Sequence, residues 1–193
     1  MQLAWPTLAL LPGYVSALEH GWTPDNERGR EAAEEELLRI EESPSRFLET
    51  LVDVEARGGP VELPDGSLVP RLPGYRKWMW DGEFCGSINL RWQPGTGALP
   101  WYCLGHVGYS VVPWKRRQGH ATHALDLLLA EARALALPYL ELTTDTGNLA
   151  SQKVILANGG VLVGEEEKPQ PYRGRRMLRY RIDLDRALIL RRN

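Results

Sequence analysis

The sequence predicts a single α/β or α+β domain, and three observations point to this class. A chain of 193 residues fits one domain comfortably. Its residues are 43% hydrophobic and 25% charged, which is an ordinary balance for a globular protein. Along the chain, a helix-rich part is followed by three strand-like runs, and then by a helix, a strand, a helix and two closing strands.

Residues 1–68 form the helix-rich part. Ser43 is suited to cap a helix that carries Pro44 in its first turn. The acidic run Glu34–Glu36 predicts a helix face that is exposed to solvent. The Pro-Asp-Gly-Ser sequence at residues 64–67 predicts a turn before the strands begin.

The middle of the chain has the two-residue period of strands. Residues 74–93 contain two apolar runs joined at Asp81-Gly82, a dipeptide that favours tight hairpins because glycine accepts positive φ. A third strand over residues 104–113 stops at Pro113, which has no N–H to donate to a ladder. Together the three runs predict a meander of strands.

The second half of the chain returns to helical spacing. From Ala121 the apolar residues recur three and four positions apart, which predicts a helix. Residues 138–144 alternate as in a strand, and the helix after them closes at Asn158-Gly159, a good C-terminal stop. A closing pair of strands is expected within residues 159–184.

Charge, cysteine content and the N-terminus exclude several classes. The formal net charge of -2 and the pI of about 6.1 provide no global positive field for nucleic acid. The apolar N-terminus contains Pro6 and Pro12 and no cationic start, so neither a signal peptide nor a membrane span is expected, and the protein is expected in the cytoplasm. Cys85 and Cys103 lie in apolar runs and are expected to be reduced packing residues.

The junction between the third strand and the next helix has the composition of an anion site. Lys115, Arg116 and Arg117 place three cations there, and Gln118 and Gly119 follow them. A helix N-terminus offers unpaired N–H groups and the positive end of the helix dipole. Gly119 lets an anion approach the backbone without an obstructing Cβ. The alternative is a loop of solvated cations before a core helix.

The spacing at this junction resembles a known signature. Residues 116–121, Arg-Arg-Gln-Gly-His-Ala, match R/Q-x-x-G-x-G/A, with Val111-x-Pro113 just upstream. This resembles the acetyl-CoA signature of the GNAT superfamily of acyl-CoA N-acyltransferases. No P-loop or Rossmann motif competes with it.

The resemblance continues through most of the chain. Asn148-x-x-Ser151 and the Asn-Gly-Gly at residues 158–160 are similar to the strand-helix-strand region that follows the family signature. The similarity covers residues 70–184 and is closest to a bacterial group of predicted acetyltransferases whose substrates are largely unassigned. It implies a mixed, mostly antiparallel central sheet of six to seven strands flanked by helices.

The resemblance also implies the domain organisation. Residues 1–193 are expected to form one N-acetyltransferase domain. Residues 1–68 would be its helix-rich N-terminal part, residues 69–184 its acetyl-CoA-binding core and residues 185–193 a C-terminal tail.

Acetyl-CoA is the implied acyl donor, and no metal is expected. The sheet would open between the strand that ends at Val111 and the strand 138–144, and the pantetheine arm would insert there. Backbone groups of the first strand would pair with the arm, and N–H groups of residues 117–122 would hold the pyrophosphate. The implied cofactor-binding residues are Tyr109, Ser110, Val111, Arg116, Arg117, Gln118, Gly119, His120, Ala121, Thr122, Asn148 and Ser151.

The general acid of the family is missing from its usual position. Many relatives carry a Tyr seven residues after the Asn, where this chain has Ile155. Tyr109 and Cys103 are the remaining candidates for the acid that protonates the leaving thiolate.

The usual position of the base is also changed, because Thr143 stands there. His106, with an intrinsic pKa suited to a base, and Glu141 on the partner strand are the candidates. The alternative for His106 is a structural histidine bonded to a neighbouring strand. The alternative for Glu141 is a carboxylate that faces solvent or an ion pair.

The sequence therefore predicts an acetyl-CoA-dependent N-acetyltransferase, in which a primary amine of a small molecule or peptide attacks the thioester directly. The alternative is a non-catalytic acyl-CoA-binding or sensing domain, which the replacement of the tyrosine by Ile155 favours. No nucleic-acid or membrane partner is expected, and a homodimer is left open. His120 and His123 could share a zinc ion only with a third ligand, which the sequence does not supply.

The tryptophans allow two interpretations. Trp78 and Trp80 share one strand face and are expected in the core. Trp22, Trp101 and Trp114 fall in expected loops, where they could line an acceptor pocket or simply pack.

Overall fold

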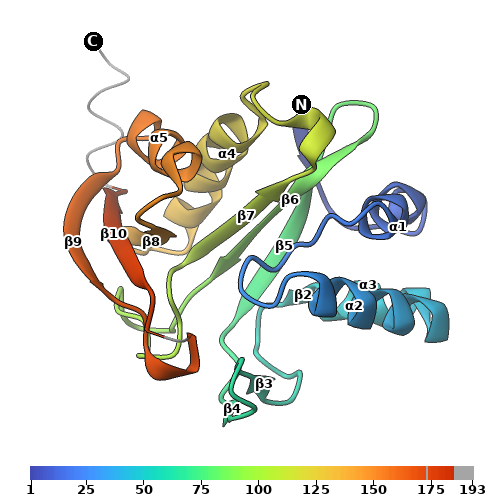
Figure 1. The fold of residues 1–193 in the computed structure, drawn as a ribbon, viewed down its shortest axis with the longest axis horizontal. Helices are drawn as coiled ribbons and strands as arrows, with labels where there is room; N and C mark the ends of the chain where they lie inside the picture. Colours follow the sequence, from blue (N-terminus) through green and yellow to red (C-terminus); the bar gives the residue numbers. More distant parts are fainter. Residues whose placement is uncertain (173, 185–193) are drawn as a thin grey trace.

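A computed structural model of the protein describes residues 1–172 and 174–184 (Figure 1). The helices are α1 (Leu11–Glu19), α2 (Arg30–Glu42), α3 (Pro44–Thr50), α4 (His120–Ala134) and α5 (Leu149–Ala157). The strands are β1 (Gln2–Ala4), β2 (Val52–Asp53), β3 (Val61–Glu62), β4 (Leu68–Val69), β5 (Gly74–Trp80), β6 (Phe84–Arg91), β7 (Val107–Val111), β8 (Tyr139–Asp145), β9 (Val161–Glu167) and β10 (Arg176–Asp183). Single 3-10 turns span Pro113–Lys115 and Gln170–Tyr172. The predicted α+β class is confirmed; the expected tail 185–193 lies outside the described residues.

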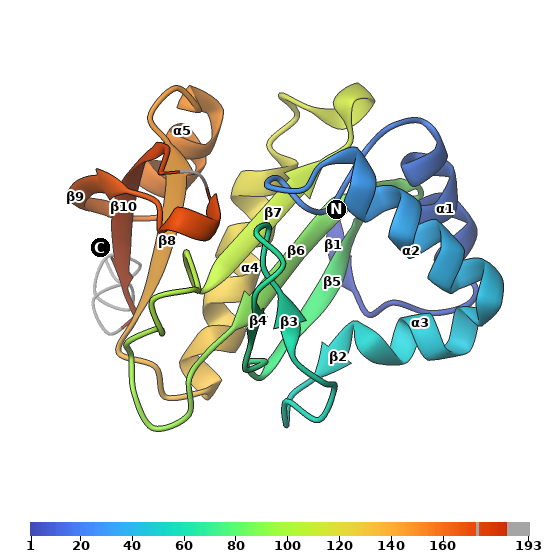
Figure 2. The same cartoon turned by 60° about the horizontal axis from the view of Figure 1, so that its bottom comes forward.

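Two sheets form the two halves of the fold. The first has the order β1-β5-β6-β7, with β2 also paired to β5, and the second has the order β8-β10-β9. Their ladders are antiparallel. β7 and β8, which α4 connects, run in the same direction but share no ladder in the described part of the chain, so the two halves splay apart (Figure 2). The expected mixed, mostly antiparallel sheet of six to seven strands corresponds to β1 and β5–β10.

The larger core lies between the first sheet and α4. Ile88 and Leu90 of β6 pack with Leu125 and Leu128 of α4, and all four side chains are fully buried or nearly so. Burial of each such side chain stabilises the fold by about 1.5–3 kcal/mol. Since successive strand residues face opposite sides, the residues between them point to the other face of the sheet, toward α1–α3.

The smaller core packs α1–α3 against that other face. Tyr14 of α1 stacks on Trp78 of β5 with ring centroids 4.9 Å apart, and Trp22, Phe47 and Phe84 surround the pair. Trp78 is therefore a core residue, as expected. Trp22 is 2% exposed and also belongs to this core, so it does not line a pocket.

The expected solvent-exposed face at Glu34–Glu36 is wrong for Glu36. The Arg76 guanidinium donates to the Glu36 carboxylate at 2.9 Å and to the Tyr14 hydroxyl at 2.8 Å, and that hydroxyl donates to the same carboxylate. A carboxylate that is only 12% exposed is tolerated here because a cation from a strand far along the chain neutralises it. A single run of glutamates in the sequence carries no sign of such a partner.

Local stop and turn signals are confirmed. The Ser43 hydroxyl accepts a hydrogen bond from the Arg46 N–H and caps α3. Gly82 turns the β5–β6 hairpin with a φ of 113°, and Gly159 ends α5 with a φ of 82°. β1 was not expected; it pairs with β5 because its apolar residues fit beside a central strand. Among the described residues, no helix is long and apolar enough to cross a membrane.

Candidate functional site

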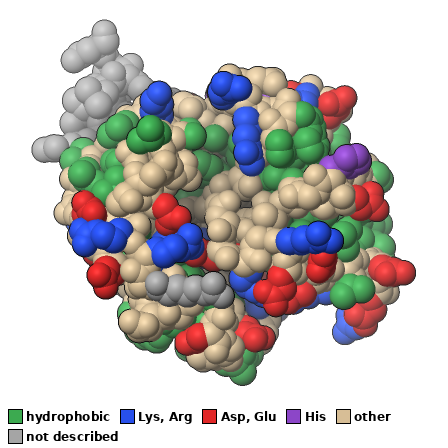
Figure 3. Space-filling view, in the orientation of Figure 1, with side chains coloured by type: hydrophobic (Ala, Val, Ile, Leu, Met, Phe, Trp, Pro, Cys, Tyr) green, Lys and Arg blue, Asp and Glu red, His purple; other side chains and the backbone are tan. Residues whose placement is uncertain are grey.

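A cleft of about 1080 Å³ occupies the gap between β7 and β8. β7, the turn after it and the start of α4 line one wall, and the end of β8 and the start of α5 line the other. The molecular surface is hollowed between the two halves of the fold (Figure 3). The lining includes these residues expected from the sequence: Tyr109, Ser110, Val111, Arg116, Arg117, Gly119, His120, Ala121, Thr122, Asn148 and Ser151.

His106 and Glu141 lie at the point where the two halves meet, and neither lines the cleft. The His106 N–H donates to the Glu141 carbonyl at 2.8 Å, and the Glu141 N–H donates to His106 Nδ1 at 3.0 Å. The imidazole thus takes the place of a strand carbonyl and joins β7 to β8 at one position. Beyond it the strands diverge. His106 is fully buried, and burial lowers its pKa to about 4.

The alternative role of His106 as a structural histidine fits this geometry better than the role of a base. We expect His106→Ala to lower the free energy of unfolding by about 2–4 kcal/mol, because the Glu141 N–H loses its acceptor and a cavity opens. Urea unfolding at neutral pH measures this loss. A variant as stable as the wild type would show that the ring does not tie the strands together.

The same histidine predicts a pH dependence of stability. Its pKa in the folded protein, about 4, lies below the ordinary value near 6.5, so the unfolded chain binds the proton first. This contribution is complete above pH 6.5 and is lost as the pH falls toward 4, by at most about 3 kcal/mol. Subtracting the unfolding free energy of His106→Asn from that of the wild type at each pH isolates it. A constant difference across this range contradicts the assignment.

Glu141 is held in an ion-pair cluster on the face opposite α4. Its carboxylate accepts from Arg179 at 3.0 Å and from Arg181 at 2.8 Å, and the Arg181 guanidinium lies 3.8 Å from the Tyr139 ring centroid. Both carboxylate oxygens are therefore already occupied by guanidinium donors. The alternative of an ion-paired Glu141 therefore agrees with the geometry.

The N-terminus of α4 carries a row of backbone N–H donors that are unpaired in the described part of the chain. The first N–H there with a helical bond is that of His123, which donates to the Gly119 carbonyl. Among the described residues, no hydrogen bond is formed by the backbone N–H groups of residues 117–122. Gly119 adopts a left-handed conformation with a φ of 80°, and nothing lies within 4 Å of the position its Cβ would take. The site is therefore open to a ligand.

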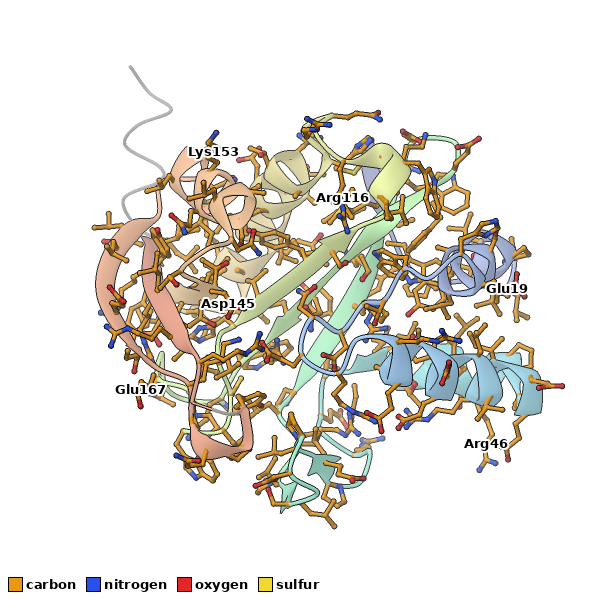
Figure 4. All side chains as sticks on the ribbon, in the orientation of Figure 1. Glu19, Arg46, Arg116, Asp145, Lys153 and Glu167 are labelled. Carbon is orange, nitrogen blue, oxygen red and sulfur yellow. The ribbon has the colours of Figure 1, made fainter. Side chains whose placement is uncertain are left out.

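The cations that precede the N-terminus of α4 differ in how free they are to bind a ligand. Lys115 is paired with Asp81 at 3.1 Å and with Glu83 at 3.3 Å. The Arg116 Nε donates to the Val111 carbonyl at 3.1 Å and leaves the rest of the guanidinium at the cleft surface (Figure 4). Arg117 is exposed and lines the cleft. The Gln118 side chain lies outside the lining and donates to the Trp114 carbonyl.

The free edge of β7 faces the cleft. β7 is in register with β6 along its whole length, and on its other side the carbonyls of Tyr109 and Val111 accept bonds from side chains outside the sheet. The Tyr109 carbonyl accepts from Asn26 Nδ2 at 3.4 Å. Backbone groups that point away from a sheet can pair with an extended ligand as a further strand would.

The opposite wall carries the start of α5. Asn148 caps this helix, because its Oδ1 accepts from the Ser151 N–H at 3.1 Å. The Tyr109 hydroxyl reaches across the cleft floor to the Ser151 hydroxyl at 2.8 Å, and burial raises the pKa of Tyr109 to about 12. Ile155 lies one turn further and is fully buried. A tyrosine of β7 thus approaches the helix from which the family tyrosine is missing.

A charged cluster that the sequence analysis did not predict closes one end of the cleft. Lys168 is 5% exposed and contacts Glu27 at 2.5 Å and Asp145 at 2.6 Å. Arg175 contacts the same two carboxylates, at 2.6 Å and 3.2 Å. The cluster ties the loop before α2 to the end of β8, where Asp145 is labelled in Figure 4. Glu27 lies more than 100 positions before Lys168 and Arg175, so no local sequence pattern predicts these ion pairs.

Three possible metal ligands meet beside the mouth of α4. Ligand atoms of Asp81, Cys85 and His120 lie within 4.8 Å of one another. The Lys115 ammonium already neutralises Asp81, and burial raises the pKa of the Cys85 thiol to about 11. His123 is exposed on α4 and is not part of this group. Both cysteines are free, as expected.

A second cavity of about 300 Å³ lies on the face of the sheet opposite α4. Its walls come from β5, β6, the β3–β4 hairpin, and the loops at residues 102–103 and 172. Trp101 and Trp114 are exposed and line neither this cavity nor the cleft. The hypothesis of a tryptophan-lined acceptor pocket is therefore not supported.

Comparison with known proteins agrees with this fold. A family model described as an acetyltransferase (GNAT) domain matches residues 68–161. The structure is similar to an α-N-acetyltransferase of ribosomal protein L7/L12 solved with coenzyme A, at 14% identity and a TM-score of 0.64, over 95% of this chain and 93% of that one. No curated protein matches the sequence.

Two further solved structures share the fold. One is a chimera of spermidine N-acetyltransferase from Vibrio cholerae, at 13% identity and a TM-score of 0.63, over 97% of this chain and 99% of that one. The other is the microcin C7 self-immunity acetyltransferase in complex with acetyl-CoA and AMP, at 12% identity and a TM-score of 0.56, over 94% and 91%.

The matched domain defines an acetyltransferase of the acyl-CoA-dependent class. The diverging sheets and the unpaired N–H groups at the N-terminus of α4 agree with this class. Residues 68–161 match the GNAT acetyltransferase domain, so the expected resemblance to the GNAT superfamily and the expected enzyme class, N-acetyltransferase, are confirmed.

Proposed function

We propose that the protein transfers the acetyl group of acetyl-CoA to the primary amine of a small molecule or peptide. The observation that carries this proposal is the row of unpaired N–H groups at residues 117–122, which opens into a cleft beside the free edge of β7. One end of this arrangement suits a pyrophosphate, and the other suits the amides of a pantetheine arm. Structural relatives solved with acetyl-CoA or coenzyme A support the same donor.

The donor would bind along one wall of the cleft. Its pyrophosphate accepts from the N–H groups around Gly119, with Arg116 and Arg117 beside it. Its pantetheine arm pairs with the carbonyls of Tyr109 and Val111, which requires Asn26 and Arg116 to release them. The thioester then lies deep in the cleft, between β7 and β8.

The reaction is a direct acyl transfer. The lone pair of a neutral amine forms the new C–N bond at the thioester carbon, the C–S bond breaks, and the electron pair leaves with the sulfur as a thiolate. The amine then loses one proton and the thiolate gains one, so that an amide and coenzyme A are released. A backbone N–H at the free edge of β7 polarises the carbonyl as charge develops on its oxygen.

We assign the stabilisation of the leaving sulfur to Tyr109. Its hydroxyl lies against α5 at Ser151, and Ile155 removes the competing tyrosine. Because burial raises the pKa of Tyr109 to about 12, the phenol keeps its proton and donates a hydrogen bond at physiological pH.

The proton of the attacking amine leaves through water in the cleft. His106 and Glu141 were candidate bases, but both lie outside the lining, and each is held by bonds of its own. A chain of water that leads out of an open cleft serves the same purpose as a fixed base.

Turnover of acetyl-CoA with a broad panel of amines tests the proposal. We expect release of coenzyme A that depends on an amine, together with an acetylated product seen by mass spectrometry. Binding of acetyl-CoA without turnover on any amine would instead support the non-catalytic sensing domain. Failure to bind acetyl-CoA at all would contradict both functions.

A further inference from the structure

The second cavity contains a guanidinium, that of Arg91, for which the described residues supply no anionic partner. Arg91 of β6 lines this cavity; its Nε is buried and makes no hydrogen bond. Within the part of the chain that the structure describes, no carboxylate lies within 4 Å of the Arg91 guanidinium. A buried donor of this kind costs free energy unless something binds it.

The other charges of the cavity are already matched. Arg76 is paired with Glu36 at 2.9 Å. Arg71 lies 3.8 Å from Asp53 and also donates to the Gly59 carbonyl at 3.0 Å. After these pairs the cavity keeps one unmatched positive charge, that of Arg91. It therefore suits an anion and repels a cation.

Arg91 also lies beside the reaction cleft. A Cβ at Gly108 would meet Arg91 Nη2 at 3.3 Å and Asn89 Oδ1 at 2.6 Å. Gly108 itself lines the cleft, so the cavity and the cleft approach one another where β7 has no side chain. A molecule held by Arg91 therefore reaches β7 on the side opposite α4, next to the place proposed for the thioester.

We propose that this cavity binds the acceptor, and that Arg91 binds a carboxylate on it. The acceptor would be a small amine that carries a carboxylate, such as a free amino acid. The planar guanidinium matches two carboxylate oxygens, and a cavity of about 300 Å³ accommodates a molecule of this size. The inference rests on the proposed acetyl transfer and adds the chemical class of the acceptor to it.

The test compares acceptors that differ only in this charge. The common L-amino acids are each assayed against their carboxamides, with spermidine as a cationic acceptor and aminoalkylphosphonates as acceptors with a different anion. For the best side chain, kcat/KM for the acid should exceed that for the amide by about 30-fold or more. Arg91→Met should bring this ratio close to one, and Arg91→Lys should restore part of it.

Two controls separate binding from folding. Arg46→Met removes from α3 an exposed cation that lines neither cavity, and it should leave the ratio unchanged (Figure 4). Arg91→Met should not lower Tm, because the side chain that it removes has no partner to lose. The KM for acetyl-CoA should also stay the same.

Equal use of acids and amides, or a preference for spermidine or for the phosphonates, overturns the inference while leaving acetyl transfer intact. If no amine is acetylated, calorimetric titration of N-acetyl-L-amino acids and of their amides into the protein decides the matter without turnover. Tighter binding of the acids that depends on Arg91 supports the inference, and the absence of such a difference overturns it. Acetyl-CoA binding, measured separately, reports on the proposed function.

Discussion

A Gly119→Glu variant should show no rise in Tm when acetyl-CoA is added. In the wild type, a donor at about 100 times its Kd stabilises the protein by about 2.7 kcal/mol, which corresponds to about 5–10 °C for a domain of this size. The space beside Gly119 is empty in the structure, so a glutamate fits there sterically. Its carboxylate then occupies the row of N–H donors and repels the pyrophosphate. We expect both the binding and the turnover of acetyl-CoA to be lost.

The control for this variant is Gly159→Glu. Gly159 has a φ of 82°, close to the 80° of Gly119, and it too has nothing within 4 Å of its Cβ position. Both variants therefore bear the same strain of a side chain at positive φ, about 1–2 kcal/mol. Only Gly119 lines the cleft. A normal acetyl-CoA shift in a folded Gly119→Glu protein would remove the pyrophosphate from this site.

The walls of the cleft could be predicted because their determinants are local. The order strand, proline, cations, glycine and helix lies within residues 107–121, and a helix N-terminus carries unpaired donors in any protein. The cap at Asn148 and the stop at Asn158-Gly159 likewise depend on neighbouring residues. The sequence therefore placed α4 and α5, and with them both walls of the cleft.

The surroundings of His106 and of Glu36 could not be predicted, because they depend on contacts between distant segments. His106 has the intrinsic pKa of a base, but a backbone N–H 35 positions away occupies its Nδ1. Glu36 is part of an acidic run, but Arg76 from a central strand buries it. Burial and pairing decide the chemistry of both groups, and neither property can be inferred from the neighbouring residues in the sequence.

The unmatched charge of Arg91 could not be predicted from the sequence for the same reason. In the sequence it is one arginine among many at the end of a strand. Its significance comes from the pairing of Arg76 and Arg71 with other carboxylates, which leaves it alone in the cavity. A missing partner can be recognised only when all the neighbours are known.

Tyr109→Phe should lower kcat by about 10²–10³-fold and leave acetyl-CoA affinity unchanged, because loss of one donor to a developing charge has an effect of this size. The backbone of residue 109, which we expect to pair with the pantetheine arm, is the same in the variant. Only the hydroxyl that meets Ser151 at 2.8 Å is removed. Single-turnover rates and calorimetric Kd values for acetyl-CoA measure the two effects separately.

Varying the acidity of the leaving thiol tests the role of the Tyr109 hydroxyl more directly. If the Tyr109 hydroxyl stabilises the thiolate, an acetyl thioester of a more acidic thiol needs that help less, and the deficit of Tyr109→Phe should shrink with such a donor. Tyr180→Phe is the control, since it removes a hydroxyl from a buried tyrosine that lines neither cavity. A folded Tyr109→Phe protein with the rate of the wild type would assign the thiolate proton to solvent. A deficit that is equal for all donors would mean that the hydroxyl positions α5 rather than serving the sulfur.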